Sequence, residues 1–150
     1  METVDLPNVE VLRSAAFREC DSLQTVNLPK VKEIWDYAFG SCKNLKTVKI
    51  PQVETILKGT FSGCSALEAV ELPLVKKIGE YAFVNCENLK TAKIPQVESI
   101  GKDAFYGCKS LKAIDFPEVE AIGEEAFCYC ENLKMVKIPQ VKTIGKNAFK

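Results

Sequence analysis

The sequence predicts an α/β solenoid: a right-handed superhelix with one parallel sheet along its concave side and short helical turns on its outer side. Three observations predict it, namely a strict 22-residue period, a fixed set of apolar positions in each period, and polar–apolar alternation before each proline. The prolines alone set the period, and all of them obey it: Pro7, Pro29, Pro51, Pro73, Pro95, Pro117 and Pro139. Units of this length bury their apolar faces only by stacking on one another.

Each unit contributes one short strand. In the segment 45–51, Val48 and Ile50 alternate with the polar Thr47 and Lys49, which is the period of a strand with one covered face. Pro51 follows at once, and because proline cannot donate a ladder hydrogen bond, it marks the end of the strand and the start of a turn.

The second half of each unit returns the chain to the next strand. In the segment 36–42, the apolar Ala38, Phe39 and Cys42 follow a spacing that suits a single helical turn with phenylalanine directed inward. A 22-residue unit with one strand and a short return has the length and order of a leucine-rich repeat.

The full motif of the unit is A-F-x-x-C-x-x-L-x-x-V-x-[LI]-P followed by V-x-x-I-G, and it runs from Leu6-Pro7 to Ala148-Phe149. It resembles the leucine-rich repeats of the BspA-like family. The resemblance implies a leucine-rich-repeat superhelix and a chain that is secreted or exposed at the cell surface, although no signal peptide is visible in the chain. It also implies functions in adhesion, matrix-protein binding and cell aggregation.

We expect residues 1–150 to form a single leucine-rich-repeat domain of about six complete 22-residue units with partial units at its ends. The chain opens inside one unit and stops inside another, which favours a segment of a longer array. End-to-end self-association that covers the terminal units is the alternative.

Composition excludes several functions. Twenty basic residues balance twenty acidic ones, so we expect no nucleic-acid partner. No apolar run approaches the ~18 residues that span a bilayer, so we expect no membrane insertion. The chain has no histidine, no phosphate-binding loop and no metal-spaced cluster, so we expect no catalytic residue, no metal and no cofactor.

Six of the seven cysteines form one column, which we expect to consist of reduced core thiols: Cys20, Cys42, Cys64, Cys86, Cys108 and Cys130. Stacked positions with parallel Cα–Cβ bonds disfavour disulfides between them. Cys128 lies outside the column, and we expect it to be partly exposed and the most reactive thiol.

The outward positions of the strands form the candidate binding face on the concave sheet. Its residues are Thr47, Lys49, Glu71, Thr91, Lys93, Asp115 and Lys137. Lysine alternates there with acidic residues, which suits either a polar recognition face or a structural ladder of cross-strand charge pairs.

A second candidate is an apolar patch near the amino end. Trp35 and Leu57 replace the glycine of the motif in neighbouring units, and Tyr37 lies close by in the sequence. Exposed, these side chains would mark a contact surface; the alternative is that Trp35 packs over the corner of the coil.

A longer period overlies the 22-residue one. Ile-Pro-Gln-Val recurs every 44 residues, at 50–53, 94–97 and 138–141. The working module is therefore a pair of units, and any binding column would repeat its chemistry on every second one.

Together these features predict a non-catalytic protein–protein interaction module that binds through its concave face. The resemblance to the BspA-like family implies that it belongs to a surface or secreted protein and that its partner is an extracellular or host protein. The alternative is a structural spacer or a self-associating stalk segment of a larger surface protein.

Overall fold

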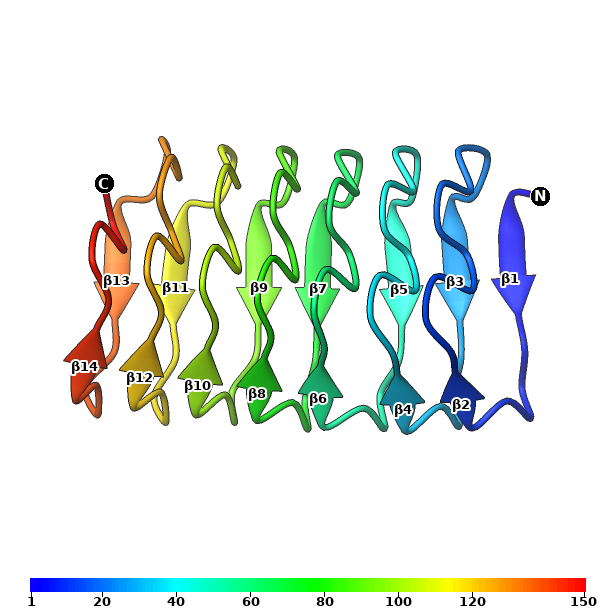
Figure 1. Ribbon diagram of the computed structural model, residues 1–150, viewed down its shortest axis with the longest axis horizontal. Coiled ribbons are helices and arrows are strands. Elements are labelled where there is room, and N and C mark those ends of the chain that lie inside the picture. The colour runs from blue at the N-terminus through cyan, green and yellow to red at the C-terminus, as the bar shows by residue number, and fades with distance from the viewer.

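The computed structural model describes residues 1–150 as one uninterrupted solenoid of parallel strands (Figure 1). We call each turn of the solenoid a rung; a rung contains one three-residue strand and one two-residue strand. The long strands are β1 (Thr3–Asp5), β3 (Thr25–Asn27), β5 (Thr47–Lys49), β7 (Ala69–Glu71), β9 (Thr91–Lys93), β11 (Ala113–Asp115) and β13 (Met135–Lys137). The short strands are β2 (Val11–Leu12), β4 (Glu33–Ile34), β6 (Thr55–Ile56), β8 (Lys77–Ile78), β10 (Ser99–Ile100), β12 (Ala121–Ile122) and β14 (Thr143–Ile144).

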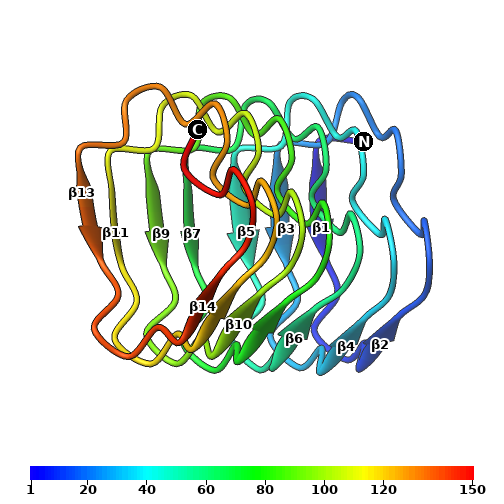
Figure 2. The same cartoon turned by 60° about the vertical axis from the view of Figure 1, so that its left-hand side comes forward.

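The long and short strands form two separate faces of the coil, and return segments close the third side (Figure 2). Paired strands run parallel with equivalent residues 22 positions apart, so Thr3 lies beside Thr25 and Ile100 beside Ile122. The sheet predicted at the concave side is the long-strand face. The short-strand face was not predicted, because a strand of two residues is too short to show polar–apolar alternation in the sequence.

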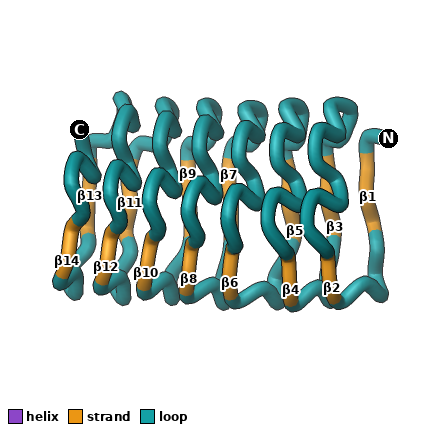
Figure 3. The backbone as a smooth tube through the Cα atoms, viewed as in Figure 1, coloured by secondary structure: helices purple, strands orange, loops and turns teal.

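The prediction of short helical turns on the outer side is wrong. The return segments, such as residues 35–46 between β4 and β5, contain turns and no helix, so the fold is all-β (Figure 3). Each complete return places two residues in the left-handed region, as with Tyr37 (φ 54°) and Ser41 (φ 60°). An α-helix cannot pass through such residues.

Hydrogen bonding explains this backbone. The amide of Phe39 donates to the carbonyl of Thr60 on the next rung at 2.9 Å, whereas Gly40 donates back to Tyr37 in its own rung, also at 2.9 Å. Alternate amides therefore bond between rungs. Three such bonds join every pair of neighbouring return segments from the first rung to the last, so this side of the solenoid is a continuous hydrogen-bonded spine.

Phenylalanine rings fill the interior beneath the spine. Neighbouring rings from Phe17 to Phe149 stack with centroids 5.1–5.6 Å apart and planes within 13° of parallel. The five central rings, Phe39, Phe61, Phe83, Phe105 and Phe127, belong to a single core of 40 buried residues, Phe17 packs against that core, and Phe149 is 39% exposed at the carboxyl end. The motif positions predicted to face inward are thus the core.

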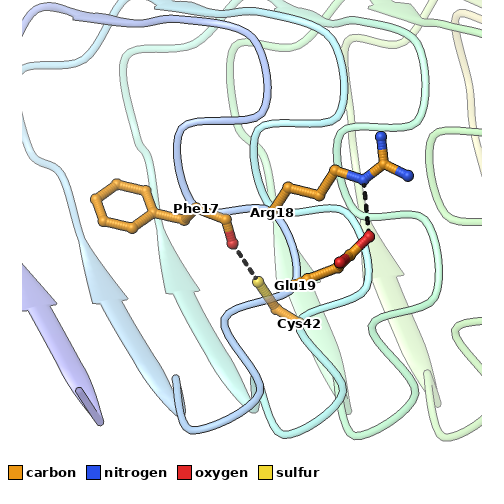
Figure 4. Close-up of polar contacts among 4 residues, drawn as sticks. All are labelled: Phe17, Arg18, Glu19 and Cys42. Atoms are coloured by element: carbon orange, nitrogen blue, oxygen red, sulfur yellow. Dashed lines mark hydrogen bonds and ion pairs between the residues drawn. The ribbon is translucent and has the colours of Figure 1, made fainter.

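The cysteine column lies against these phenylalanines. The thiol of Cys42 donates to the carbonyl oxygen of Phe17 on the preceding rung at 2.9 Å (Figure 4). The next four cysteines of the column repeat this contact at 3.2 Å. All seven cysteines are free thiols. The same view shows Arg18 paired with Glu19 at 3.3 Å on the outside of the first return segment.

Cys128 is not the exposed thiol that we expected. It is only 2% exposed, and burial raises its pKa. The final residues cover this region, since the amide of Tyr129 donates to the carbonyl of Lys150 at 2.9 Å. Cys20, on the first return segment, is the least buried cysteine.

The glycines of the V-x-x-I-G motif are required by close approach. A Cβ on Gly123 would lie 2.6 Å from the carbonyl carbon of Gly101, one rung earlier, and one on Gly145 would lie 2.3 Å from the Glu124 nitrogen. Neither glycine has a positive φ. In these glycine-bearing rungs the backbones pack so closely that a side chain would have to displace backbone, whereas Trp35 and Leu57 occupy the same motif position in earlier rungs.

Candidate functional site

The long-strand face is interrupted twice, because hydrogen bonds join β1-β3-β5, β7-β9 and β11-β13 as three separate groups. Leu72 donates to Lys93 across the intact β7–β9 step at 3.0 Å, but no hydrogen bond joins Ile50 to Glu71 across the β5–β7 step. The β9–β11 step is open in the same way. Wider spaces between these strands are visible in Figure 1.

Both interruptions follow a strand that ends in Ile-Pro-Gln, at residues 50–52 and 94–96. Strands that end in Leu-Pro or Phe-Pro, at 6–7, 28–29, 72–73 and 116–117, keep their bonds to the next rung. The 44-residue period of the sequence is therefore a period of the hydrogen-bond pattern.

Each interruption forms a shallow groove. The first groove measures about 700 Å³ and is lined by Asn27, Lys46, Thr47, Val48, Lys49, Ile50, Pro51, Glu68, Ala69, Glu71 and Pro73. The second groove measures about 780 Å³ and is lined by Lys90, Thr91, Ala92, Lys93, Ile94, Pro95, Lys112, Ala113, Asp115 and Pro117. All ten lining positions of the second groove lie 44 residues beyond a lining position of the first, so the molecule presents the same arrangement twice, with Lys112 in the place of Glu68.

Six of the seven residues predicted on this face line the two grooves. Thr47, Lys49 and Glu71 belong to the first groove. Thr91, Lys93 and Asp115 belong to the second. Lys137 lies outside both, on β13.

Charge pairing along this face is partial. Lys93 contacts Glu71 at 3.2 Å and Lys137 contacts Asp115 at 3.9 Å, as the ladder interpretation predicted. Lys90 bonds Glu68 at 2.8 Å and thereby lowers the pKa of that carboxyl. In contrast, three groove lysines have no carboxylate within 4.0 Å: Lys46, Lys49 and Lys112. These exposed cations are available to a ligand.

The grooves also carry backbone groups without protein partners. In the first groove they are the amides of Ile50 and Glu68 and the carbonyls of Lys46 and Glu71. Their counterparts in the second groove are the amides of Ile94 and Lys112 and the carbonyls of Lys90 and Asp115. The sequence analysis missed these groups, for which the recurring Ile-Pro-Gln was the available signal.

The short-strand face has a single interruption, between β4 and β6. Trp35 and Leu57 follow these two strands and are 38% and 37% exposed. They line a slot of about 480 Å³ together with Lys32, Glu33, Ile34, Gln52, Glu54, Thr55 and Leu74. The structure thus brings together two of the three residues of the predicted apolar patch.

Tyr37, the third residue of that patch, does not line the slot. Its ring covers Gly59, and a Cβ on that glycine would lie 2.2 Å from the ring. The guanidinium of Arg18 lies 5.6 Å from the same ring. Tyr37 is therefore a packing residue of the spine.

No three cysteine, aspartate or glutamate side chains converge as a metal ion would require. The structure contains no helix long and apolar enough to cross a lipid bilayer.

Comparison with known proteins bears on this geometry. A family model described as a BspA type leucine rich repeat region, in six copies, matches residues 1–97 and 54–150, which together span the whole chain. The chain belongs to the BspA-type leucine-rich repeat family. No curated protein shows significant similarity to it.

Solved structures similar to this chain include three bacterial leucine-rich repeat proteins. A leucine-rich repeat protein from Bacteroides ovatus is 27% identical with a TM-score of 0.68, over 96% of this chain and 48% of that one. A leucine-rich repeat protein from Eubacterium ventriosum is 27% identical with a TM-score of 0.73, over 78% and 33%. A leucine rich cell surface protein from Faecalibacterium prausnitzii is 24% identical with a TM-score of 0.63, over 93% and 32%.

This BspA-type chain thus spans about half the length of the Bacteroides ovatus protein and about a third of the other two. The family defines a repeat scaffold of the kind that proteins use for interaction, and no catalytic family matches the chain.

Proposed function

We propose that this chain is a non-catalytic protein-interaction module of a secreted or cell-surface protein, and that it binds an extracellular or host protein through its long-strand face. Membership of the BspA-type family supports an interaction role. The surface location and the adhesive role follow from the resemblance to that family.

One observation carries the proposal: two grooves with equivalent lining positions lie on one face, each with backbone donors and acceptors that no protein group satisfies. Open strand edges of this kind are a template for pairing with another chain. The unpaired lysines beside them add charge that can orient a ligand.

A structural spacer, the alternative function, would gain nothing from these grooves. Closing the ladder at both steps would add backbone hydrogen bonds of the kind found at β7–β9, each worth roughly 0.5–1.5 kcal/mol. The repeated opening therefore favours binding over length alone.

The test is affinity capture from extracellular and cell-surface extracts, followed by identification of the captured protein and titration of its purified form. The parent chain is compared with Lys49→Glu/Lys112→Glu, which changes one unpaired lysine in each groove and leaves the Lys93–Glu71 ion pair intact. The matched control is Lys77→Glu, on the short-strand face.

We expect the identified partner to bind the parent and the control and to bind the double variant at least tenfold more weakly, with all three proteins melting within a few degrees. Equal binding by the double variant would place the site elsewhere. A parent chain that captures nothing would support the spacer.

A further inference from the structure

The slot between β4 and β6 lies on the short-strand face, away from both grooves. Its walls are the indole of Trp35 and the side chain of Leu57. Between them the ladder is open, because neither Leu57 nor Glu54 donates to the preceding rung, whereas Gly79 donates to Ile56 at 2.7 Å one step later.

The slot contains unpaired carbonyls and carboxylates as well as the free amides of Glu54 and Leu57. The carbonyls of Lys32 and Ile34 receive no hydrogen bond. The carboxylates of Glu33 and Glu54 have no cation within 4.0 Å, and the Glu33 carboxylate accepts only the indole N–H of Trp35 at 3.3 Å. Lys32 is the one cationic residue of the lining.

The ring of Trp35 already contacts one guanidinium of the chain. Arg13, from the preceding rung, places its Cζ 4.9 Å from the centre of the Trp35 ring. Tryptophan is the best of the aromatic rings for such a contact, and arginine is its commonest partner. The slot lies toward the next rung, where no residue of the chain plays this role.

We propose that the slot receives the side chain of an arginine from a protein partner. The aliphatic stem packs between Trp35 and Leu57, and the guanidinium N–H groups donate to the Ile34 carbonyl and to the Glu54 carboxylate. This interaction surface is separate from the proposed long-strand function, so either can fail without the other.

Arginine fits this slot better than other side chains for physical reasons. The lining carries two carboxylates, those of Glu33 and Glu54, and one cation, that of Lys32, and its net negative charge disfavours an anionic group. A purely apolar side chain would bury the carbonyls of Lys32 and Ile34 without a hydrogen-bond partner, which lowers the affinity. Lysine brings one compact ammonium, whereas the planar fork of arginine reaches several acceptors at once and stacks on indole.

Trp35 is the only tryptophan of the chain, so its fluorescence reports on the slot directly. The probes are the capped tripeptide acetyl-Gly-Arg-Gly-amide and its lysine, norleucine and glutamate analogues, titrated at constant ionic strength. We expect a saturable change with the arginine peptide in the millimolar range, at least threefold weaker binding of the lysine peptide, and no saturation with the other two.

Two variants and one control assign that signal to the slot. Glu54→Gln and Leu57→Ala should each weaken binding of the arginine peptide at least threefold. Glu98→Gln, in the position equivalent to Glu54 two rungs along and outside the slot, should leave it unchanged. The proposal is overturned if the arginine peptide gives no saturable change, if the glutamate or norleucine peptide binds equally well, or if Glu98→Gln weakens binding as much as Glu54→Gln.

Discussion

Ile50 and Glu71 occupy the positions that Leu72 and Lys93 occupy one rung later, yet only the second pair is joined by a backbone hydrogen bond. The same contrast separates Ile94 and Asp115 from the pair Phe116 and Lys137, whose bond is 2.9 Å. Two open steps thus alternate with closed ones along a face whose sequence is regular.

Hydrogen exchange should reveal the open steps. We expect the amides of Ile50 and Ile94 to exchange at least tenfold faster than those of Leu28 and Leu72, because only the latter two are hydrogen-bonded. Amide-resolved NMR exchange at neutral pH measures these rates. Equal protection at all four positions would mean that the long-strand ladder is continuous in solution.

Substitution of the residue before proline should close an open step. A residue in that position is restricted by the proline ring, and β-branching restricts it further, whereas leucine occupies the position at three of the closed steps. We expect Ile50→Leu to slow exchange of its amide severalfold, with the reversed change Leu72→Ile as the matched counterpart. Unchanged exchange in both variants would show that residue 50 does not control the opening.

The glycine edge should not tolerate a methyl group. Because a Cβ on Gly123 would lie 2.6 Å from the Gly101 carbonyl carbon, we expect Gly123→Ala to lower the free energy of unfolding by about 1–3 kcal/mol in urea titrations. Gly40→Ala is the control, since its nearest contact would be 3.3 Å. A loss for Gly40→Ala as large as that for Gly123→Ala would contradict the close-approach explanation.

The phenylalanine stack should lose most stability at its centre. Phe83 lies between Phe61 and Phe105 and is fully buried, so we expect Phe83→Ala to cost about 3–5 kcal/mol. Phe17 has only one stacked neighbour and is half-buried, so Phe17→Ala should cost clearly less. Chemical denaturation of both variants tests the ranking, which an equal loss would refute.

The buried thiols should make stability fall in alkaline solution. Burial raises the pKa of Cys42 to about 11 and that of Cys130 to about 12, and it raises the pKa of Cys86 well above the ordinary value of 9.0. The unfolded chain therefore loses thiol protons at a pH where the folded chain keeps them, and stability is lost as the pH rises above about 9.

We expect each such thiol to contribute about 1 kcal/mol to the loss between pH 8 and pH 10. Urea unfolding of the parent and of Cys86→Ala at both pH values isolates one contribution, because the variant should lose less stability over that interval. An equal loss in both proteins would mean that the Cys86 thiol ionises alike in the folded and unfolded chains.

The part of the fold that rests on a strict period was predictable. Phe39, Cys42 and Val48 recur in register and lie where an inward position requires. The return segments were not predictable in the same way, because the left-handed positions hold residues as different as Tyr37, Glu125 and Gly59. Their backbone is imposed by bonds to the next rung, which no local spacing reveals.

The candidate sites also combine features that the sequence predicts with features that depend on bonds between rungs. Lys49 and Lys93 were placed correctly on one face because strand alternation fixes the side on which a residue lies. Their strands border grooves because hydrogen bonds are missing between neighbouring rungs. This is a property of the stacked array and not of a single unit. Trp35 and Leu57 were singled out because each departs from the repeat, and they line one slot. Tyr37 was grouped with them by nearness in the sequence, and its ring covers Gly59 instead.

The uninterrupted spine has a mechanical consequence. Its three hydrogen bonds per step make the return side the more rigid edge of the array. The open steps on the two strand faces lack such bonds and are therefore easier to stretch. A load applied along the array therefore opens the β4–β6, β5–β7 and β9–β11 steps first, and these border the surfaces to which we assign binding.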